Sequence, residues 1–494
     1  MLNDTEPRTP VSGCRSIFNP RRLPKILFCL LTPCLLAQSL VIKNVTIIDA
    51  TGAAPRKNLD VAISSARISA IQKKIKPPRD TQIIDGRGKF LIPGLWDMHI
   101  HLGPPEIFFP LLIANGITGV REMFTGIPIE TIRAWRKRPD VPRIVAPGFI
   151  DGPPMLWTGP APPGAIAVET PEQARFAVHA LAQSGVDFLK VYNSIPRDAY
   201  FALAAEARAI GIPFAGHVPE AVNPGEASDA GQRSEEHLIN ILLACSTREE
   251  ELRAARVAAM LDKSMSGEAR MRLLAFPDSV ELSETYSEAK AANLFRTFVR
   301  NGTWQTPTLA LLEGFASVRD AAFLNDPTHR YALPAWRDAW DPRNTFFLKD
   351  LPPADYDALN IRIHALLERH EKLVGDMHRA GVEFLAGTDT NGWNPVIPGF
   401  SLHEELALLV KSGLSPLEAL QSATRNPARY FGPAAQIGTI EIGKAADLVL
   451  LTADPAQDIR NTQKIDAVIL RGHYFSRENL DGMLQQASTA AAHP

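Results

Sequence analysis

Two hydrophobic patterns divide the chain. From 40 to 90, and again from 434 to 478, apolar and polar residues alternate in short runs such as LVIKNVTIID and KIDAVILRG. Alternation that breaks at Gly, Pro and Asp is typical of strands with one buried face. Because this pattern occurs near both ends, we expect one small β-sandwich domain built from both halves of the chain, followed by a tail over 479–494.

Between these β-rich parts, residues 91–433 repeat an apolar strand followed by a helix. Helix-like stretches such as PEQARFAVHALAQSG separate most of the strand-like runs. This order indicates parallel strands of an α/β protein, and about eight of them predict a closed (β/α)8 TIM barrel. An open doubly wound sheet is the alternative, although the sequence lacks the G-x-G-x-x-G phosphate motif of many such folds. A charged helical insertion at about 246–300 either covers the barrel mouth or forms a solvated pair of surface helices.

The first 39 residues have the pattern of an export signal. Basic residues precede the apolar run ILFCLLTPCLLA, which is too short to cross a bilayer. We therefore expect a signal peptide over 1–39 and a periplasmic or secreted mature chain without a stable membrane span. A buried strand or helix is the alternative for this run, and Pro33 before Cys34 fits a lipid anchor poorly.

Composition narrows the class of partner. The 494 residues are 45% hydrophobic and 21% charged, as in ordinary globular proteins. A net charge of −2 gives no basic field, so we expect no nucleic-acid partner. Three of the four cysteines lie in the expected leader, and Cys245 alone cannot form an internal disulfide in the mature chain.

Two histidines on the first predicted barrel strand are candidate metal ligands. His99 and His101 are two residues apart, so in a strand both imidazoles point to the same side. Two imidazoles on one face suit zinc and similar ions. Barrel enzymes place their catalytic groups at the C-terminal ends of the strands, and further candidates occur there. They are Lys190, His217, His237 and Asp389.

Each of these four residues also has an ordinary structural interpretation as a surface lysine, a core or surface histidine, or a helix N-cap. Their coincidence in strand register favours one common site. Two further residues are candidates for substrate contact. Tyr192 is either a hydrogen-bond donor to substrate or a packed core tyrosine, and His403 either touches substrate or opens the helix after the last strand.

These motifs resemble those of the amidohydrolase superfamily, in particular its imidazolonepropionase-like and Xaa-Pro-dipeptidase-like members. The resemblance covers about residues 40–476 and rests on LIPGLWDMHIHL, DFLKVY, AGHV, SEEHL, FLAGTD and LHEELALLVKSGLSPLEALQSATRNPARYFG. It implies a barrel with an appended β-sandwich and a centre of two divalent metal ions, commonly zinc. Gly119 and Glu122 depart from the family pattern, which usually has Thr and Asp there.

The resemblance also implies a role for each candidate ligand. Lys190, carboxylated by CO2, would bridge the two ions. One ion would be held by His99, His101 and Asp389, and the other by His217 and His237.

The implied reaction is hydrolysis of a carbon–nitrogen bond by a hydroxide shared between the ions. Asp389 would take the proton of that hydroxide and pass it to the leaving nitrogen. An exported enzyme of this kind is expected to act on small amides or peptides, as a dipeptidase, a carboxypeptidase-like enzyme or an N-acyl amino acid hydrolase.

Two alternatives stay open at this point. One is a mononuclear deaminase or cyclic imidazolone hydrolase of the same superfamily, against which Lys190 argues. The other is a non-catalytic metal-binding protein on the same scaffold. The sequence does not determine the oligomeric state, and a homo-oligomer is compatible with it.

Overall fold

The computed structural model describes residues 39–153, 163–262, 264–276, 279–345, 348–349 and 351–493. The expected export signal and its three cysteines lie outside these residues. Among the helices of the described parts, none has both the length and the apolar composition that crossing a bilayer requires.

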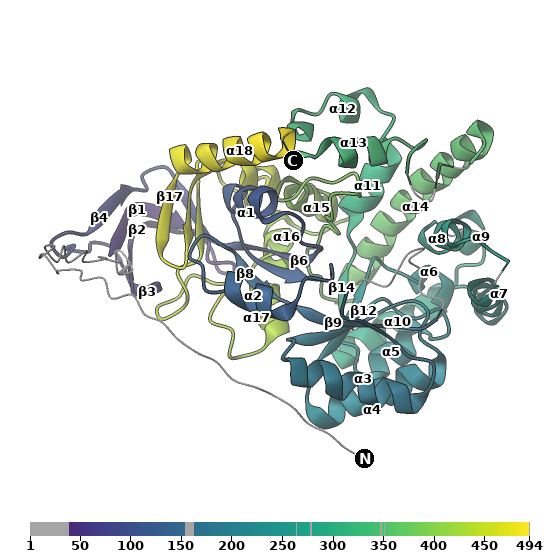
Figure 1. Cartoon of the computed structure of the whole chain (residues 1–494). Coiled ribbons are helices and arrows are strands. Elements are labelled where there is room, and N and C mark those ends of the chain that lie inside the picture. The colour runs from purple at the N-terminus through teal and green to yellow at the C-terminus, as the bar shows by residue number, and fades with distance from the viewer. Residues whose placement is uncertain are drawn as a thin grey trace, which may run out of the picture. The chain divides into compact units, whose positions relative to one another are not determined.

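Strands from both ends of the chain form one eight-stranded sheet (Figure 1). Its order is β17-β16-β15-β5-β1-β2-β3, and β4 pairs with β1. The two halves meet where β5 runs antiparallel to β15, with Leu91 opposite Leu450. The strands are β1 (Leu40–Ile47), β2 (Arg56–Ser64), β3 (Arg67–Gln72), β4 (Gln82–Asp85), β5 (Phe90–Pro93), β15 (Leu448–Leu451), β16 (Ile465–Leu470) and β17 (His473–Ser476).

The alternating residues of this sheet bury one set of side chains. Ile42, Ile63, Leu91, Leu448 and Ile469 belong to one apolar cluster and are at most 1% exposed. The pattern therefore predicted strands from both termini correctly, and the period of two explains why alternate residues share the cluster. The β-sandwich arrangement of these strands stays a prediction.

Parallel strands form two further sheets. The first has the order β6-β7-β8 and the second the order β10-β9-β11-β12-β13-β14. Residues near 384–390 connect them, because Phe384 bridges to Gln305 of β14 and Thr390 to Ile100 of β6, both in parallel. The strands are β6 (Leu95–Ile100), β7 (Ile117–Glu122), β8 (Arg143–Val145), β9 (Pro147–Asp151), β10 (Ala165–Ala167), β11 (Phe188–Val191), β12 (Phe214–Gly216), β13 (Ser234–Glu236) and β14 (Trp304–Thr306).

Helices follow most of these parallel strands, so the expected α/β class is confirmed as TIM-barrel-like. Up to β14 they are α1 (Pro105–Ala114), α2 (Ile129–Trp135), α3 (Pro171–Ser184), α4 (Arg197–Ile210), α5 (Pro224–Ala230), α6 (Ile241–Ala244), α7 (Glu249–Leu261), α8 (Gly267–Ala275), α9 (Ser279–Glu284) and α10 (Glu288–Asn301). The rest are α11 (Leu309–Ser317), α12 (Ala321–Leu324), η1 (Pro327–Tyr331), α13 (Pro334–Trp340), α14 (Pro353–Arg379), α15 (Phe400–Lys411), α16 (Pro416–Ser422), α17 (Arg425–Phe431), η2 (Ile459–Gln463) and α18 (Arg477–Ala492).

Local signals in the sequence fix the ends of these helices, as α3 illustrates. Thr170 accepts a hydrogen bond from the backbone N–H of Gln173, and the Gln173 side chain accepts one from the backbone of Thr170. Gly185 ends the helix in the left-handed region at φ 77°. This capping box and glycine satisfy backbone groups that a helix leaves unpaired, which explains the sharp ends of α3.

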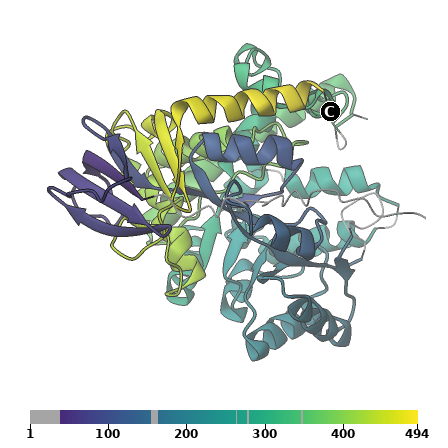
Figure 2. The ribbon, with the colours of Figure 1, turned by 60° about the vertical axis from the view of Figure 1, so that its left-hand side comes forward.

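The stretch that we expected to be a tail is a helix. Residues 477–492 form α18, which packs along α1 and lies beside it in both views (Figures 1 and 2). Leu480, Ala487 and Ala491 are buried and occur at helical spacing, so α18 has an apolar face. Alanine is a strong helix former, and the alanines of this stretch lie in a packed helix.

The described part of the insertion contains the helices α7, α8, α9 and α10. Met260 of α7 packs against Met271 of α8 and against Tyr192, which follows strand β11. The insertion therefore contacts a residue at the end of a parallel strand, and it is more than a solvated surface pair.

The packing between β6 and β7 can be tested where Gly119 lies close to Trp96. A Cβ at Gly119 of β7 would lie 2.1 Å from Trp96 Cε2, whereas a Cβ at Gly482 of α18 would have no neighbour within 4 Å. We expect Gly119→Ala to lower the free energy of unfolding by about 1–3 kcal/mol because it overpacks the core. Gly482→Ala should instead raise it by about 0.5–1 kcal/mol, since alanine favours the helix. Denaturant unfolding measures both, and a Gly119→Ala protein as stable as wild type would contradict this packing.

Candidate metal centre

Six predicted residues lie at the C-terminal ends of parallel strands. His99 is on β6 and His101 directly follows it, while Lys190 is on β11. The list is completed by His217 after β12, His237 after β13, and Asp389 in the segment that bridges to β6. Parallel strands have their carboxyl ends at one edge, which explains why residues far apart in sequence meet.

One carboxylate and two imidazoles form the tightest group. Asp389 Oδ1 lies 3.0 Å from His101 Nε2 and 3.3 Å from His99 Nε2. One ligating atom from each of the three residues lies within 4.8 Å of the others, which is the spacing of a candidate metal site. The ring of His237 is 4.4 Å from that of His99 and 4.8 Å from that of His217, centre to centre. All four imidazoles therefore belong to one cluster.

The four histidines are held through the same ring nitrogen. Each Nδ1 lies within hydrogen-bond distance of a protein oxygen, and each of these oxygens is an acceptor. The pairs are His99 with Glu236 Oε2 at 2.8 Å, His101 with the Phe124 carbonyl at 2.8 Å, His217 with Asn193 Oδ1 at 2.6 Å and His237 with Thr308 Oγ1 at 2.8 Å.

Two of these acceptors are fixed by their own hydrogen bonds. The Thr308 hydroxyl donates to the Pro307 carbonyl at 2.8 Å, so it accepts from His237. The Asn193 amide nitrogen donates to Glu220 Oε1 at 3.3 Å, which leaves its oxygen for His217. Because Nδ1 donates in every ring, Nε2 is left as the nitrogen that can meet a metal ion.

Lys190 is a buried amine in the same region. Its Nζ has no hydrogen-bond partner among the described residues, and neither does Nε2 of His99. Burial lowers the pKa of Lys190 to about 8, although the negative charges of Glu236 and Asp389 oppose the shift. A buried polar atom without a partner is costly, so both atoms indicate a site that a ligand completes.

A buried ion pair holds Glu236, the residue that accepts the hydrogen bond from His99 Nδ1. Arg121 Nη2 donates to both carboxylate oxygens of Glu236, at 2.8 and 2.9 Å, and neither side chain is exposed to solvent. Arg121 Nε also donates to the Met98 carbonyl at 2.6 Å. Burial would raise the pKa of Glu236, but the Arg121 charge and the hydrogen bond from His99 hold it well below its usual value. Glu236 is therefore ionised and fixes the orientation of His99.

The backbone at the strand ends is strained. Asp389, His237, Thr308 and Phe124 all have positive φ, at 54°, 63°, 51° and 92°. These are conformations that residues other than glycine rarely adopt, and they cluster at functional sites. Two of these residues are candidate ligands and the other two supply acceptors to histidines, so the strain lies at the cluster itself.

The structure brings Tyr192 to the cluster but not His403. The ring of Tyr192 lies 4.0 Å from that of His217, centre to centre. His403 is buried on α15, where its Nδ1 bonds Thr462 Oγ1 of η2 at 2.9 Å. Its expected role in substrate binding therefore has no support from its surroundings.

Four supporting residues were not identified from the sequence. They are Arg121, Glu236, Asn193 and Thr308. Two of them carried a usable signal, because a charge inside a buried strand such as ITGVRE must be paired. The polar residues Asn193 and Thr308 follow strands and carried no such signal.

Comparison with known proteins agrees with this geometry. The sequence profile of the amidohydrolase family matches residues 90–474. The chain belongs to the amidohydrolase family. This confirms the resemblance found from the sequence motifs, and it confirms the enzyme class, a hydrolase of carbon–nitrogen bonds.

Individual relatives match over short stretches. Ochratoxinase of Aspergillus niger is 35% identical over 109 residues, 22% of this chain and 22% of its own length. Imidazolonepropionase of Maricaulis maris is 37% identical over 99 residues, 20% of this chain and 24% of its own length. The chain thus matches about a fifth to a quarter of the length of these relatives.

Solved structures are similar over most of the chain. Bottromycin amidohydrolase has a TM-score of 0.66 at 24% identity and covers 92% of both chains. A Xaa-Pro dipeptidase with bound methionine has a TM-score of 0.60 at 18% identity, covering 89% of this chain and 100% of its own. At these identities the likeness establishes the amidohydrolase fold.

The Arg121–Glu236 pair provides the test of this site. Glu236→Gln keeps the shape but leaves the buried guanidinium without a counter-charge, and we expect a loss of about 3–5 kcal/mol in the free energy of unfolding. Asp85→Asn removes the partner of Arg87 from an exposed pair and should leave stability unchanged. Equal stability of the two variants in denaturant unfolding would show that the buried pair contributes nothing.

Proposed function

We propose that the chain hydrolyses an amide or peptide bond with two divalent metal ions, of which zinc fits best. The observation that carries the proposal is the common orientation of four imidazoles, each with Nδ1 committed to a protein acceptor. Nitrogen and carboxylate ligands in one buried cluster suit zinc.

The described donors fit such a centre. His99, His101 and Asp389 would hold one ion, and His217 and His237 the other. Lys190, whose buried Nζ has no hydrogen-bond partner among the described residues, would bind both ions through the oxygens of a carbamate. In that step the neutral amine forms a bond to the carbon of CO2 and releases a proton, and the lowered pKa of Lys190, about 8, favours the neutral amine.

When bound, the ions would polarise the scissile carbonyl and make water a better nucleophile. The chain's own residues supply the proton transfer. Burial opposes ionisation of Asp389, but the neighbouring His237, His101 and His99 hold its pKa well below the usual range. Asn394 donates to Oδ2 at 3.3 Å, which leaves Oδ1 facing the histidines. Asp389 would accept the proton of the attacking water and return it to the leaving nitrogen as the C–N bond breaks.

The same reasoning extends to the architecture. We infer that the parallel strands close into a (β/α)8 barrel over residues 91–433, with the terminal strands as a separate β-sandwich domain. A single residue, Ala146, separates β8 from β9, and residues 384–390 bridge β14 to β6. These links support a circuit of parallel neighbours without an open edge.

For substrate we propose dipeptides or N-acyl amino acids, and for location the periplasm or the extracellular medium. The location rests on the pattern of residues 1–39 alone. A mononuclear deaminase or a cyclic amide hydrolase is the second candidate. The buried Lys190 in the cluster argues against this second candidate, because a centre with one metal ion needs no bridging lysine.

Activity is tested with the zinc-loaded protein on a panel of dipeptides and N-acyl amino acids. We expect turnover, and we expect Asp389→Asn to lower kcat by about 10²–10⁴-fold because the proton acceptor is lost. His179→Asn is the control, since His179 is half exposed and pairs with Glu206 away from the cluster. An unchanged rate in Asp389→Asn would reject Asp389 as the proton acceptor, whereas zinc binding without turnover of any substrate by the wild-type protein would favour a non-catalytic metal-binding protein.

The bridge is tested by metal content and by ¹³C NMR. Protein prepared with ¹³C-bicarbonate should contain two ions per chain and show one carbamate carbon. Lys190→Met should lose that signal and at least one ion, because the bridging ligand is missing. Lys89→Met is the matched control, since that lysine pairs with Asp466 at the terminal sheet. One ion per wild-type chain with an unmodified Lys190 would reject the binuclear centre.

A further inference from the structure

A cavity of about 420 Å³ opens directly beside His237. One wall follows that histidine in sequence and the other walls come from the helical insertion and α14. The residues are Leu238, Leu242 and Leu243, Leu252, Ala255 and Ala259 of α7, Leu273 of α8, Leu282 of α9, and Leu366 and His370 of α14. The volume lies within the usual range of small-molecule sites.

The walls of this cavity are apolar, and its charged members are already paired. Arg256 donates to Glu220 at 2.8 Å and to the Leu273 carbonyl at 3.2 Å. Glu281 pairs with Arg248 at 2.7 Å. A charged group entering this cavity would therefore lose its hydration without gaining a free counter-charge.

Two uncharged polar atoms of residues in the walls are buried and have no hydrogen-bond partner in the described part of the chain. They are Asn240 Oδ1 and His370 Nδ1. Both residues are less than a tenth exposed, and both line the cavity. Neither atom carries a formal charge, so these two residues leave the walls of the cavity without a free charge.

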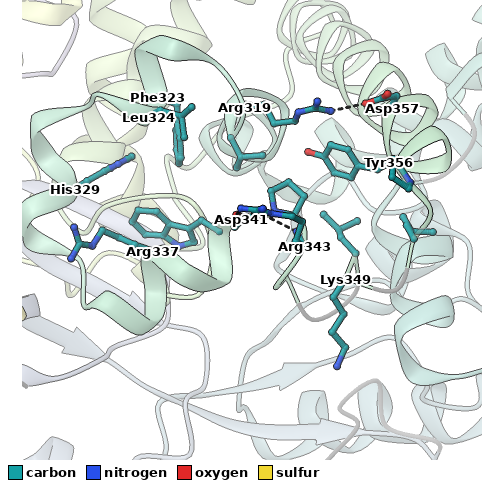
Figure 3. Close-up of a pocket in the computed structure, with 16 residues that line it drawn as sticks. Arg319, Phe323, Leu324, His329, Arg337, Asp341, Arg343, Lys349, Tyr356 and Asp357 are labelled. Atoms are coloured by element: carbon teal, nitrogen blue, oxygen red, sulfur yellow. Dashed lines mark hydrogen bonds and ion pairs between the residues drawn. The ribbon is translucent and has the colours of Figure 1, made fainter.

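A larger cavity of about 780 Å³ is lined by residues of α12, η1, α13 and α14 and of the loops between them (Figure 3). Its walls carry the ion pairs Arg319–Asp357 and Arg343–Asp341. None of the residues that line it belongs to the histidine cluster. Size alone therefore does not identify the substrate pocket, and contact with His237 favours the smaller cavity.

We propose that the cavity beside His237 receives an uncharged apolar substituent on one side of the scissile amide, either an aromatic side chain or an acyl chain. The proposal rests on the proposed function, because His237 would hold the ion that meets the amide. Helices α7–α9 then determine substrate selectivity. The packing of Met260 on Tyr192 supports this role, since it places α7 at the His217 side of the cluster as well.

Two neighbouring alanines of α7 provide a matched test. Ala259 lines the cavity, whereas Ala258 is exposed and does not. The substrates are N-acetylglycine as the small arm, N-acetylphenylalanine and Phe-Gly as the aromatic arms, and N-octanoylglycine as the acyl arm. The wild-type protein should prefer either the aromatic arms or the acyl arm over N-acetylglycine, which identifies the source of the apolar group.

Ala259→Phe should lower kcat/KM for the preferred bulky substrate by about 10–200-fold, mainly through KM, because the new ring fills the cavity. N-acetylglycine should change less than about threefold, and Ala258→Phe should leave all rates unchanged. Equal losses on every substrate, or no loss at all, would overturn the proposal.

A binding measurement separates this proposal from the proposed function. The wild-type protein should bind N-phenyl-1-naphthylamine, an uncharged fluorescent probe, and Ala259→Phe but not Ala258→Phe should weaken that binding at least tenfold. Selective loss of probe binding without amide turnover would reject the proposed function and support the pocket. Turnover with equal probe binding in both variants would reject the pocket and leave the function standing.

Discussion

The ion pair between Arg121 and Glu236 is the interaction on which the site depends. It joins β7 to β13, and through His99 and the Met98 carbonyl it also joins both strands to β6. Removing two charges from water costs several kcal/mol per ion, so such a pair persists only when its hydrogen bonds are satisfied. Here Glu236 also accepts from Ser234 at 2.5 Å, and the network leaves one orientation for His99.

The histidine cluster shows how a scaffold prepares a site before any ligand arrives. Each ring is held at Nδ1, so no rotation is needed to present Nε2. His99 lies between two carboxylates, with Glu236 at Nδ1 and Asp389 near Nε2. A carboxylate at the far nitrogen makes an imidazole a stronger electron donor. The positive φ of His237 and Asp389 adds a conformational cost, which the surrounding strands and hydrogen bonds must offset.

The sequence was informative where apolar and polar residues alternate regularly, and where a polar residue ends an apolar strand. The predicted strand ends at His99 and Lys190 agree with β6 and β11, because a short apolar run followed by a polar residue marks such an end. The sequence offered no means of separating His403 from these residues. His403 also follows the last strand segment, and only the packing of η2 against α15 shows that its partner is Thr462.

The sequence also could not show which distant residues pair, because such pairs form only through the packing of the fold. Arg121 and Glu236 are 115 positions apart, and neither ITGVRE nor SEE indicates which distant charge pairs with its own. The sequence also could not predict that α7–α9 form a wall beside His237. The sequence of a charge-rich amphipathic helix shows that it has an apolar face, but not which surface that face covers.

The sheet built from both ends of the chain has a consequence for biosynthesis. Strand β5 cannot pair with β15 until β15 has been synthesised, some 355 residues later if counted from Pro93 to Leu448. At about 5–20 residues per second this takes roughly 20–70 seconds. During that interval β5 exposes an unpaired edge of the kind that promotes aggregation. The nascent chain therefore needs protection until its last strands emerge, and the terminal sheet is the part that completes folding.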